Sequence, residues 1–120
     1  MFYAAMIDLS RVTNYYVACG YTDLRLGIDG LAAIVMTQYG MELQEDSLFL
    51  FCGRRRDRIK GLYWEQDGFI LLYKRLSAGP FQWQRNRQEA MSITQEQFDW
   101  LMKGMTIASS IRETKQKKLY

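Results

Sequence analysis

Histidine is absent from this chain of 120 residues, and cysteine occurs only twice. Without histidine there is no Ser-His-Asp triad and no histidine-based metal site, and the most common general base near neutral pH is missing. Two cysteines alone cannot complete a four-ligand zinc site. We therefore expect Cys19 and Cys52 to be reduced core residues of an intracellular protein, although the sequence also permits a disulfide between them.

Long apolar runs are also missing. No stretch of about 20 apolar residues occurs, so the sequence predicts no membrane span. The N-terminal residues, MFYAAMIDLS, lack the basic start and long apolar centre of a signal peptide, and Met6 is an alternative start. These absences fit a cytoplasmic protein of a bacterial or viral type.

The carboxylates form no pattern suited to catalysis. Asp23 and Asp29 are six residues apart on a predicted helix, which turns them about 240° from each other at about 100° per residue. Asp57 lies among arginines and is expected to pair with one of them. No glycine-rich phosphate-binding motif occurs in its required context between strand and helix. The sequence therefore predicts a protein that is not an enzyme, with no catalytic residues, metal or cofactor.

Apolar residues make up 48% of the chain and aromatic residues 14%, which is enough for a packed core. The length fits a single domain, 1–120. Apolar runs and turn residues predict consecutive extended segments, with an Asp67-Gly68 hairpin turn, at 15–20, 47–52, 58–66, 69–76 and 78–84. The predicted fold class is α+β: a compact domain in which a mostly antiparallel β-meander packs against one or two helices.

Two helices are predicted. The first spans 22–39, with Thr22 as N-cap, Gly40 at its end and an apolar face of Leu24, Ile28, Leu31 and Val35. The second spans 92–104 and contains a capping box of Thr94 and Gln97. The basic C-terminal tail, 105–120, is compatible with a helical extension and with a flexible arm.

Positive charge is concentrated in the second part of the chain. Residues 1–50 carry two basic and six acidic groups, whereas residues 51–120 carry 14 basic and seven acidic groups. The densest stretch reads FCGRRRDRIKGLYW and begins at Phe51. Such asymmetry favours an anionic partner on one face.

The arginines of this stretch fall in a predicted turn, from which they can point outward. Two following basic residues share one face of the next strand, and a two-residue hairpin turn would bring two more from the neighbouring strand near them. Arginine binds phosphate through two parallel hydrogen bonds. The candidate nucleic-acid-binding residues are Arg54, Arg55, Arg56, Arg58, Lys60, Lys74 and Arg75, and Arg85 and Arg87 are candidates to join them.

A structural explanation competes with this one. Turns are often charged because they are solvated, and lysine on an edge strand deters aggregation. The aromatic residues nearby are more typical of a core than of base-stacking surfaces. We therefore expect core positions for Tyr63, Trp64, Phe69 and Tyr73.

Two blocks of the sequence resemble a known family. They read ACGYTDLRLGIDGLAAIV and LFLFCGRRRDRIKGLYWEQDGFILLYKRLSAGPFQW. In content and order they are similar to the small accessory protein, labelled TnpB, that the second open reading frame of insertion sequences of family sixty-six encodes. The resemblance runs from about Tyr16 to Trp83.

The resemblance implies a bacterial mobile element and a non-catalytic role that assists DNA transposition, while a separate, larger transposase cuts and joins the DNA. It carries over no catalytic residues. Two hypotheses follow. In the first, the arginine-rich loop binds transposon DNA and the rest of the protein docks to the transposase; in the second, the protein is an adaptor that contacts only protein partners of the same element.

Overall fold

The computed structural model describes residues 9–65, 67–77, 80–85 and 89–103. The elements in chain order are η2 (Leu9–Arg11), β1 (Asn14–Ala18), α1 (Ile28–Ala33), the π-helix η3 (Ile34–Gln38), β2 (Ser47–Cys52), β3 (Arg58–Glu65), β4 (Gly68–Arg75), β5 (Ala90–Ile93) and α2 (Gln95–Met102). The strands form one sheet in the order β4-β3-β2-β1-β5. The predicted α+β class and the mostly antiparallel sheet are confirmed. The predicted tail, 105–120, and Met6 lie outside the described residues.

The middle of the chain forms the predicted meander. Antiparallel ladders join β2 to β3 and β3 to β4, and Arg75 lies opposite Arg58, whereas a turn at Asp67-Gly68 would place Arg75 opposite Lys60. The turn itself differs in position. Gly68 pairs with Glu65 and is therefore the first residue of β4 instead of a turn residue.

The outer strands depart from a simple meander. β1 lies beside β2 in parallel, with α1 in the connection between them, and β5 runs antiparallel to β1. The extra strand expected at 78–84 is wrong, because residues 80–85 form no strand and make isolated bonds such as Phe81 N to Arg56 O at 2.6 Å. Phe81 and Trp83 are both buried, so this irregular segment has the alternating pattern of a strand.

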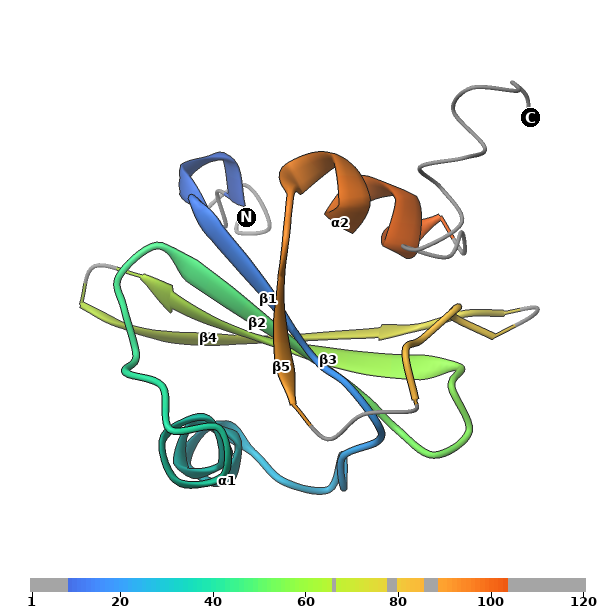
Figure 1. The fold of residues 1–120 in the computed structure, drawn as a ribbon, viewed down its shortest axis with the longest axis horizontal. Helices are drawn as coiled ribbons and strands as arrows, with labels where there is room; N and C mark the ends of the chain where they lie inside the picture. The colour runs from blue at the N-terminus through green and yellow to red at the C-terminus, as the bar shows by residue number, and fades with distance from the viewer. Residues whose placement is uncertain (1–8, 66, 78–79, 86–88, 104–120) are drawn as a thin grey trace, which may run out of the picture.

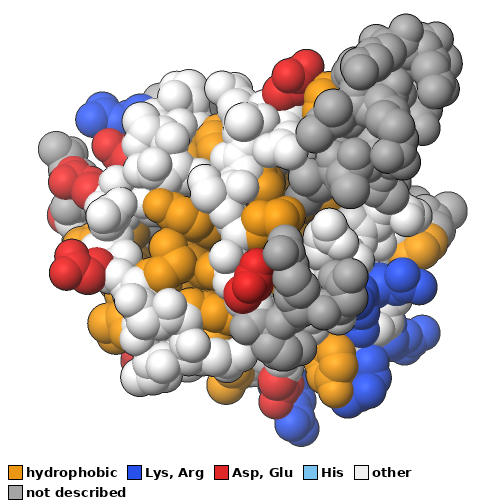
Figure 2. All heavy atoms as spheres, viewed as in Figure 1, with side chains coloured by type: hydrophobic (Ala, Val, Ile, Leu, Met, Phe, Trp, Pro, Cys, Tyr) orange, Lys and Arg blue, Asp and Glu red, His pale blue; other side chains and the backbone are white. Residues whose placement is uncertain are grey.

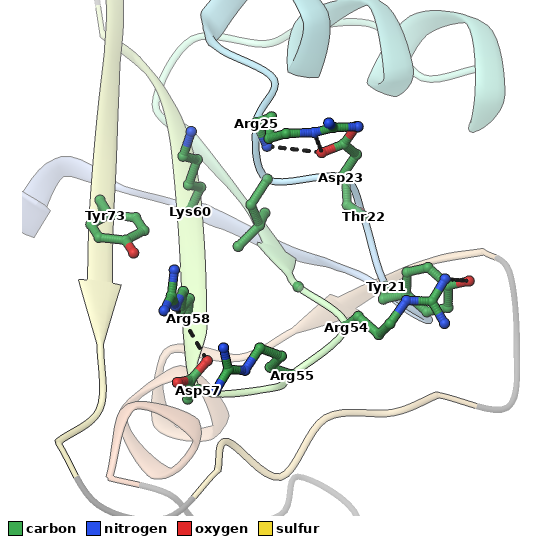
Figure 3. Close-up of a pocket in the computed structure, with 12 residues that line it drawn as sticks. Tyr21, Thr22, Asp23, Arg25, Arg54, Arg55, Asp57, Arg58, Lys60 and Tyr73 are labelled. Carbon is green, nitrogen blue, oxygen red and sulfur yellow. Dashed lines mark hydrogen bonds and ion pairs between the residues drawn. The ribbon is translucent and has the colours of Figure 1, made fainter.

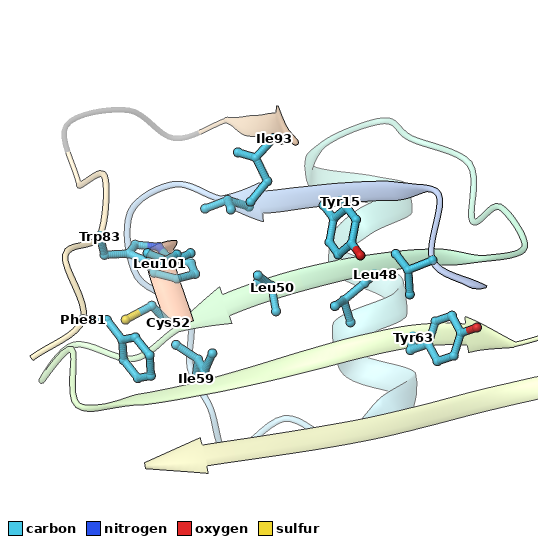
Figure 4. Packing of buried hydrophobic residues seen from close by; sticks show 12 residues of the cluster. Tyr15, Leu48, Leu50, Cys52, Ile59, Tyr63, Phe81, Trp83, Ile93 and Leu101 are labelled. Atoms are coloured by element: carbon cyan, nitrogen blue, oxygen red, sulfur yellow. The ribbon is translucent and has the colours of Figure 1, made fainter. Parts of the chain in front are cut away.

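α1 and α2 lie on opposite faces of the sheet (Figure 1), and an apolar cluster lies on each of these faces. On the face covered by α2, Leu48, Leu50, Tyr63, Phe81 and Leu101 are among the buried residues (Figure 4). On the face covered by α1, the buried residues include Leu31, Val35, Phe49, Phe51 and Leu62. Because β2 contributes to both clusters, its sequence is an almost continuous apolar run.

The first helix is shorter than predicted. Gly27, not Thr22, is its N-cap. The Thr22 backbone N–H donates to Cys52 O at 2.8 Å, and the Asp23 carboxylate accepts a bond from the Arg25 N–H at 3.0 Å. The bond to the Asp23 side chain holds the chain in a turn, which is how short polar side chains compete with helix formation. The predicted apolar face is nevertheless correct, and Gly40 has the positive φ of 63° expected after a helix.

Both cysteines are buried and neither forms a disulfide bond, as predicted. Burial raises the pKa of the Cys52 thiol to about 12, so the thiol stays protonated at neutral pH. Thiolate chemistry is therefore disfavoured at Cys52.

The second helix begins at Gln95, three residues later than predicted, because Ser92 and Ile93 belong to β5. The predicted capping box is confirmed. Gln97 N donates to Thr94 Oγ1 at 3.0 Å, and Thr94 N donates to Gln97 Oε1 at 2.9 Å.

Replacing Thr94 with alanine is expected to lower the free energy of unfolding by about 1 kcal/mol, because the N–H of Gln97 loses its partner. Urea denaturation followed by circular dichroism measures this change. The matched control is Gln95→Ala, at an exposed neighbour outside the box. Equal stability of the two variants would contradict a stabilising role of the capping box.

Candidate nucleic-acid interface

The loop between β2 and β3 carries the arginine cluster as a compact turn. Gly53 N donates to Arg58 O at 3.2 Å, and Arg56 N donates to Gly53 O at 3.1 Å. Arg56 has a positive φ of 63°. The turn leaves Arg54, Arg55 and Arg56 exposed, as the sequence predicts.

Segments distant in sequence hold this loop in place. Leu76 N donates to Asp57 O at 2.8 Å, and Phe81 N donates to Arg56 O at 2.6 Å. The Arg85 guanidinium donates to Gly53 O and Arg54 O, at 3.2 and 3.3 Å. The backbone that carries the arginines is therefore restrained from two sides. The backbone positions of the arginines are largely set before any ligand binds.

An open groove of about 910 Å³ lies beside the loop, and we call it the basic groove. Figure 3 shows Tyr73 of β4 at one side and Tyr21 at the other, with the side chains of β3 and the arginine loop between them. The lining residues are Tyr21, Thr22, Asp23, Leu24, Arg25, Gly53, Arg54, Arg55, Asp57, Arg58, Lys60 and Tyr73. Five of these are basic and two are acidic, so the groove has an excess of positive charge. The space-filling view shows Lys and Arg gathered at the lower right, over the end of the sheet that carries this loop (Figure 2).

Several basic side chains of the groove already have partners. The Arg54 guanidinium lies 4.1 Å from the Tyr21 ring centroid and donates to its hydroxyl. Lys60 Nζ donates to Leu26 O at 3.0 Å, so Lys60 also holds the turn before α1. Arg58 Nε lies 3.5 Å from Asp57 Oδ1, which places the predicted arginine partner beside Asp57. Arg55 has none of these contacts and is exposed at the groove.

Each of the two carboxylates that line the groove lies beside the guanidinium of an arginine. Arg25 and Asp23 form an ion pair at 2.9 Å. The hydrogen bond from the Arg25 side chain, followed by that from its backbone N–H, lowers the pKa of Asp23 to about 2. A carboxylate with so low a pKa is a poor proton acceptor near neutral pH.

The chain also matches a known protein family. The family model described as IS66 Orf2 like protein matches residues 13–112. The chain belongs to the IS66 Orf2-like family. This confirms the resemblance seen in the sequence, and membership indicates an accessory role in transposition.

Two relatives of this IS66 Orf2-like protein come from Sinorhizobium fredii (strain NBRC 101917 / NGR234). "Uncharacterized protein y4jC" is 32% identical over 100 residues, which cover 83% of this chain and 86% of that protein. "Uncharacterized protein y4hO" is 29% identical over 100 residues, which cover 83% of this chain and 87% of that protein. No solved structure matches the chain.

The candidate residues of the IS66 Orf2-like chain do not all lie in the groove. Arg54, Arg55, Arg58 and Lys60 line it. Arg75 lies opposite Arg58 on the same face of the sheet and extends the positive surface along β4. Arg56 is exposed on the loop but is not part of the groove lining.

Lys74 lies on the other face of the sheet. It pairs with Ile59, whose side chain belongs to the core on the α2 side, and its Nζ donates to Met102 O at 3.3 Å. Adjacent strand residues point to opposite faces, so Lys74 and Arg75 cannot both face the groove. Arg85 and Arg87 are the two further candidates. The Arg85 side chain donates a hydrogen bond to the backbone of the arginine loop, and Arg87 lies outside the described residues.

Sequence reasoning missed the aromatic part of the site. Tyr63 is buried, as predicted, but the core position expected for Tyr73 is wrong: 55% of this residue is exposed. Tyr21 is 45% exposed at the other side of the groove. In either register Tyr73 shares a face of the sheet with Lys60, and this shared face is the signal that could have placed Tyr73 beside basic side chains.

Within 9–65, 67–77, 80–85 and 89–103, no group of three or more Cys, Asp or Glu side chains is placed to hold a metal ion. In the same part of the chain, no helix is long and apolar enough to cross a membrane.

Proposed function

We propose that this protein is a non-catalytic accessory factor of transposition that binds the DNA of its insertion sequence through the basic groove. The observation that carries the proposal is the convergence of five basic side chains, from Arg25 and from the stretch 54–60, on one groove whose described lining includes two carboxylates. Guanidinium groups suit phosphate because their planar geometry allows two parallel hydrogen bonds.

The restrained loop supports the same proposal. The arginines stand on a backbone that hydrogen bonds from Leu76, Phe81 and Arg85 hold in place. A ligand that binds there does not have to order the loop, so less conformational entropy is lost on binding. This arrangement favours a binding surface over a solvated turn.

A non-catalytic role is supported by the pairing of the groove carboxylates. Asp23 is bound to Arg25, Asp57 lies beside Arg58, and histidine is absent from the sequence. The groove therefore offers phosphate-binding groups, and both carboxylates of its described lining lie against an arginine side chain. We assign cutting and joining of DNA to the transposase of the element, with this protein as its partner on the DNA.

The test is fluorescence anisotropy with labelled DNA from the ends of the element, in duplex and in single-stranded form, between 50 and 200 mM salt. For about four phosphate contacts the affinity should fall about 50- to 150-fold over this range. The Arg55→Gln variant should bind more weakly, with a salt slope shallower by about 1. Its matched control is Arg56→Gln, the adjacent exposed arginine outside the groove lining, which should bind as the wild type does.

Absence of binding to both DNA forms at 50 mM salt would overturn this function. The adaptor hypothesis would then take its place, with the basic groove facing an acidic patch of the transposase. Co-purification with the transposase that weakens in Arg55→Gln but not in Arg56→Gln would establish that alternative.

A further inference from the structure

The basic groove contains exposed aromatic rings as well as charge. Three large hydrophobic residues are exposed in the described part of the chain: Tyr21, Met36 and Tyr73. Two of the three line this one groove. Tyr21 already contacts Arg54, but phosphate binding requires no aromatic ring at the position of Tyr73, so the charge of the groove leaves Tyr73 unexplained.

Tyr73 is placed as an open stacking surface. It lies on β4, the edge strand, directly opposite Lys60, and the neighbouring pair on the same face is Arg58 and Arg75. No hydrogen bond or ring contact joins the Tyr73 side chain to the rest of the described chain, and 55% of the residue is exposed. Its ring is therefore held on a sheet next to basic side chains while it remains accessible.

Tyr21 supplies a second flat surface across the groove. The guanidinium of Arg54 lies 4.1 Å from its ring centroid, and that of Arg85 lies 5.3 Å away. These contacts fix the ring beside the arginine loop. Both aromatic rings and guanidinium planes are surfaces on which unpaired bases stack.

We propose that the basic groove binds single-stranded DNA, with an unpaired base stacked on Tyr73 and with Arg55 and Arg58 on the flanking phosphates. This inference rests on the proposed DNA-binding function and specifies that the bound DNA is single-stranded. In a duplex the bases are stacked on one another, so only phosphates would reach the groove and the tyrosines would add nothing. Alternation of aromatic and basic side chains along a groove is the usual means of holding a single strand without reading its sequence.

The experiment compares one oligonucleotide from the end of the element as a single strand and as a duplex at the same salt concentration. The wild type should bind the single strand at least about 10-fold more tightly. Tyr73→Leu should weaken single-strand binding about 5- to 100-fold, the effect expected for loss of one base–aromatic stack. The same variant should leave duplex affinity and the salt slope unchanged, because no charge is removed.

Tyr73→Phe is the matched control, since it keeps the ring and removes only the hydroxyl, and it should bind as the wild type does. Thermal unfolding should give the same midpoint for all three proteins, because an exposed side chain contributes little to stability. Met36→Leu, at the exposed hydrophobic residue outside the groove, should leave binding unchanged.

The possible failures separate this inference from the proposed function. Equal affinity for single strand and duplex, with no effect of Tyr73→Leu, would overturn base stacking and leave phosphate binding by the groove intact. Tighter binding of duplex than of single strand would do the same. Absence of binding to either form at 50 mM salt would overturn both proposals together.

Discussion

Replacing Phe81 with alanine is expected to lower the free energy of unfolding by about 3–5 kcal/mol. Phe81 is fully buried in the cluster under α2, although it belongs to a segment without regular structure. Removal of its ring leaves a cavity between that segment and the end of the sheet (Figure 4). Domains of this size have stabilities of about 5–15 kcal/mol, so the loss is a large fraction of the total.

Chemical denaturation with urea measures the effect. Phe81→Leu, which keeps most of the apolar volume, should lose less than about 1.5 kcal/mol. Gln82→Ala, at the half-buried neighbour, is the matched control and should change stability by less than about 1 kcal/mol. A wild-type midpoint for Phe81→Ala would show that the segment at 80–85 is not packed as described.

The same substitution connects stability to the site. The Phe81 N–H donates to Arg56 O, so the position of the buried ring helps to hold the arginine loop. We therefore expect Phe81→Leu, which still folds, to retain DNA binding, because that backbone bond is kept. The core on the α2 side thus supports the loop that lines the basic groove.

Features with local causes could be predicted from the sequence. The capping box of Thr94 and Gln97 is formed by residues three apart, and the antiparallel pairing of β3 with β4 follows from a short hairpin, although its register differs from the predicted one. β5 could not be predicted in this way. It has only four residues directly before the N-cap, and its apolar residue Ile93 continues the pattern of the helix that follows.

Which side chains line the groove depends on contacts between segments that are far apart in the sequence. Tyr21 meets Arg54, 33 residues later, because β1 lies parallel to β2 and both strands end at the same edge. Parallel strands are joined by a long crossover and leave no local turn signal in the sequence. The exposure of Tyr73 likewise depends on β4 being the edge strand, which no pattern within β4 reveals.

Replacing Arg54, Arg55 and Arg58 together with glutamine is expected to lower DNA affinity about 100- to 1000-fold at 50 mM salt. Each lost charged hydrogen bond to phosphate contributes roughly 1.5 kcal/mol, which is about a factor of 10 in affinity. The slope of log affinity against log salt should become shallower by about 2 to 3, since each lost contact no longer releases a counterion. Fluorescence anisotropy over a salt series measures both quantities.

The charge-matched control is the triple variant Arg11→Gln, Lys74→Gln and Lys103→Gln. It removes the same net charge from exposed positions, none of which lines the groove. If binding depends on the groove, this control should keep most of its affinity and its salt slope. If both triple variants lose affinity equally, DNA binding depends only on the overall charge of the protein, and the geometry of Arg54, Arg55 and Arg58 has no role. The comparison therefore distinguishes a phosphate-binding site with fixed geometry from a generally basic surface. The net charge of the protein alone does not distinguish the two.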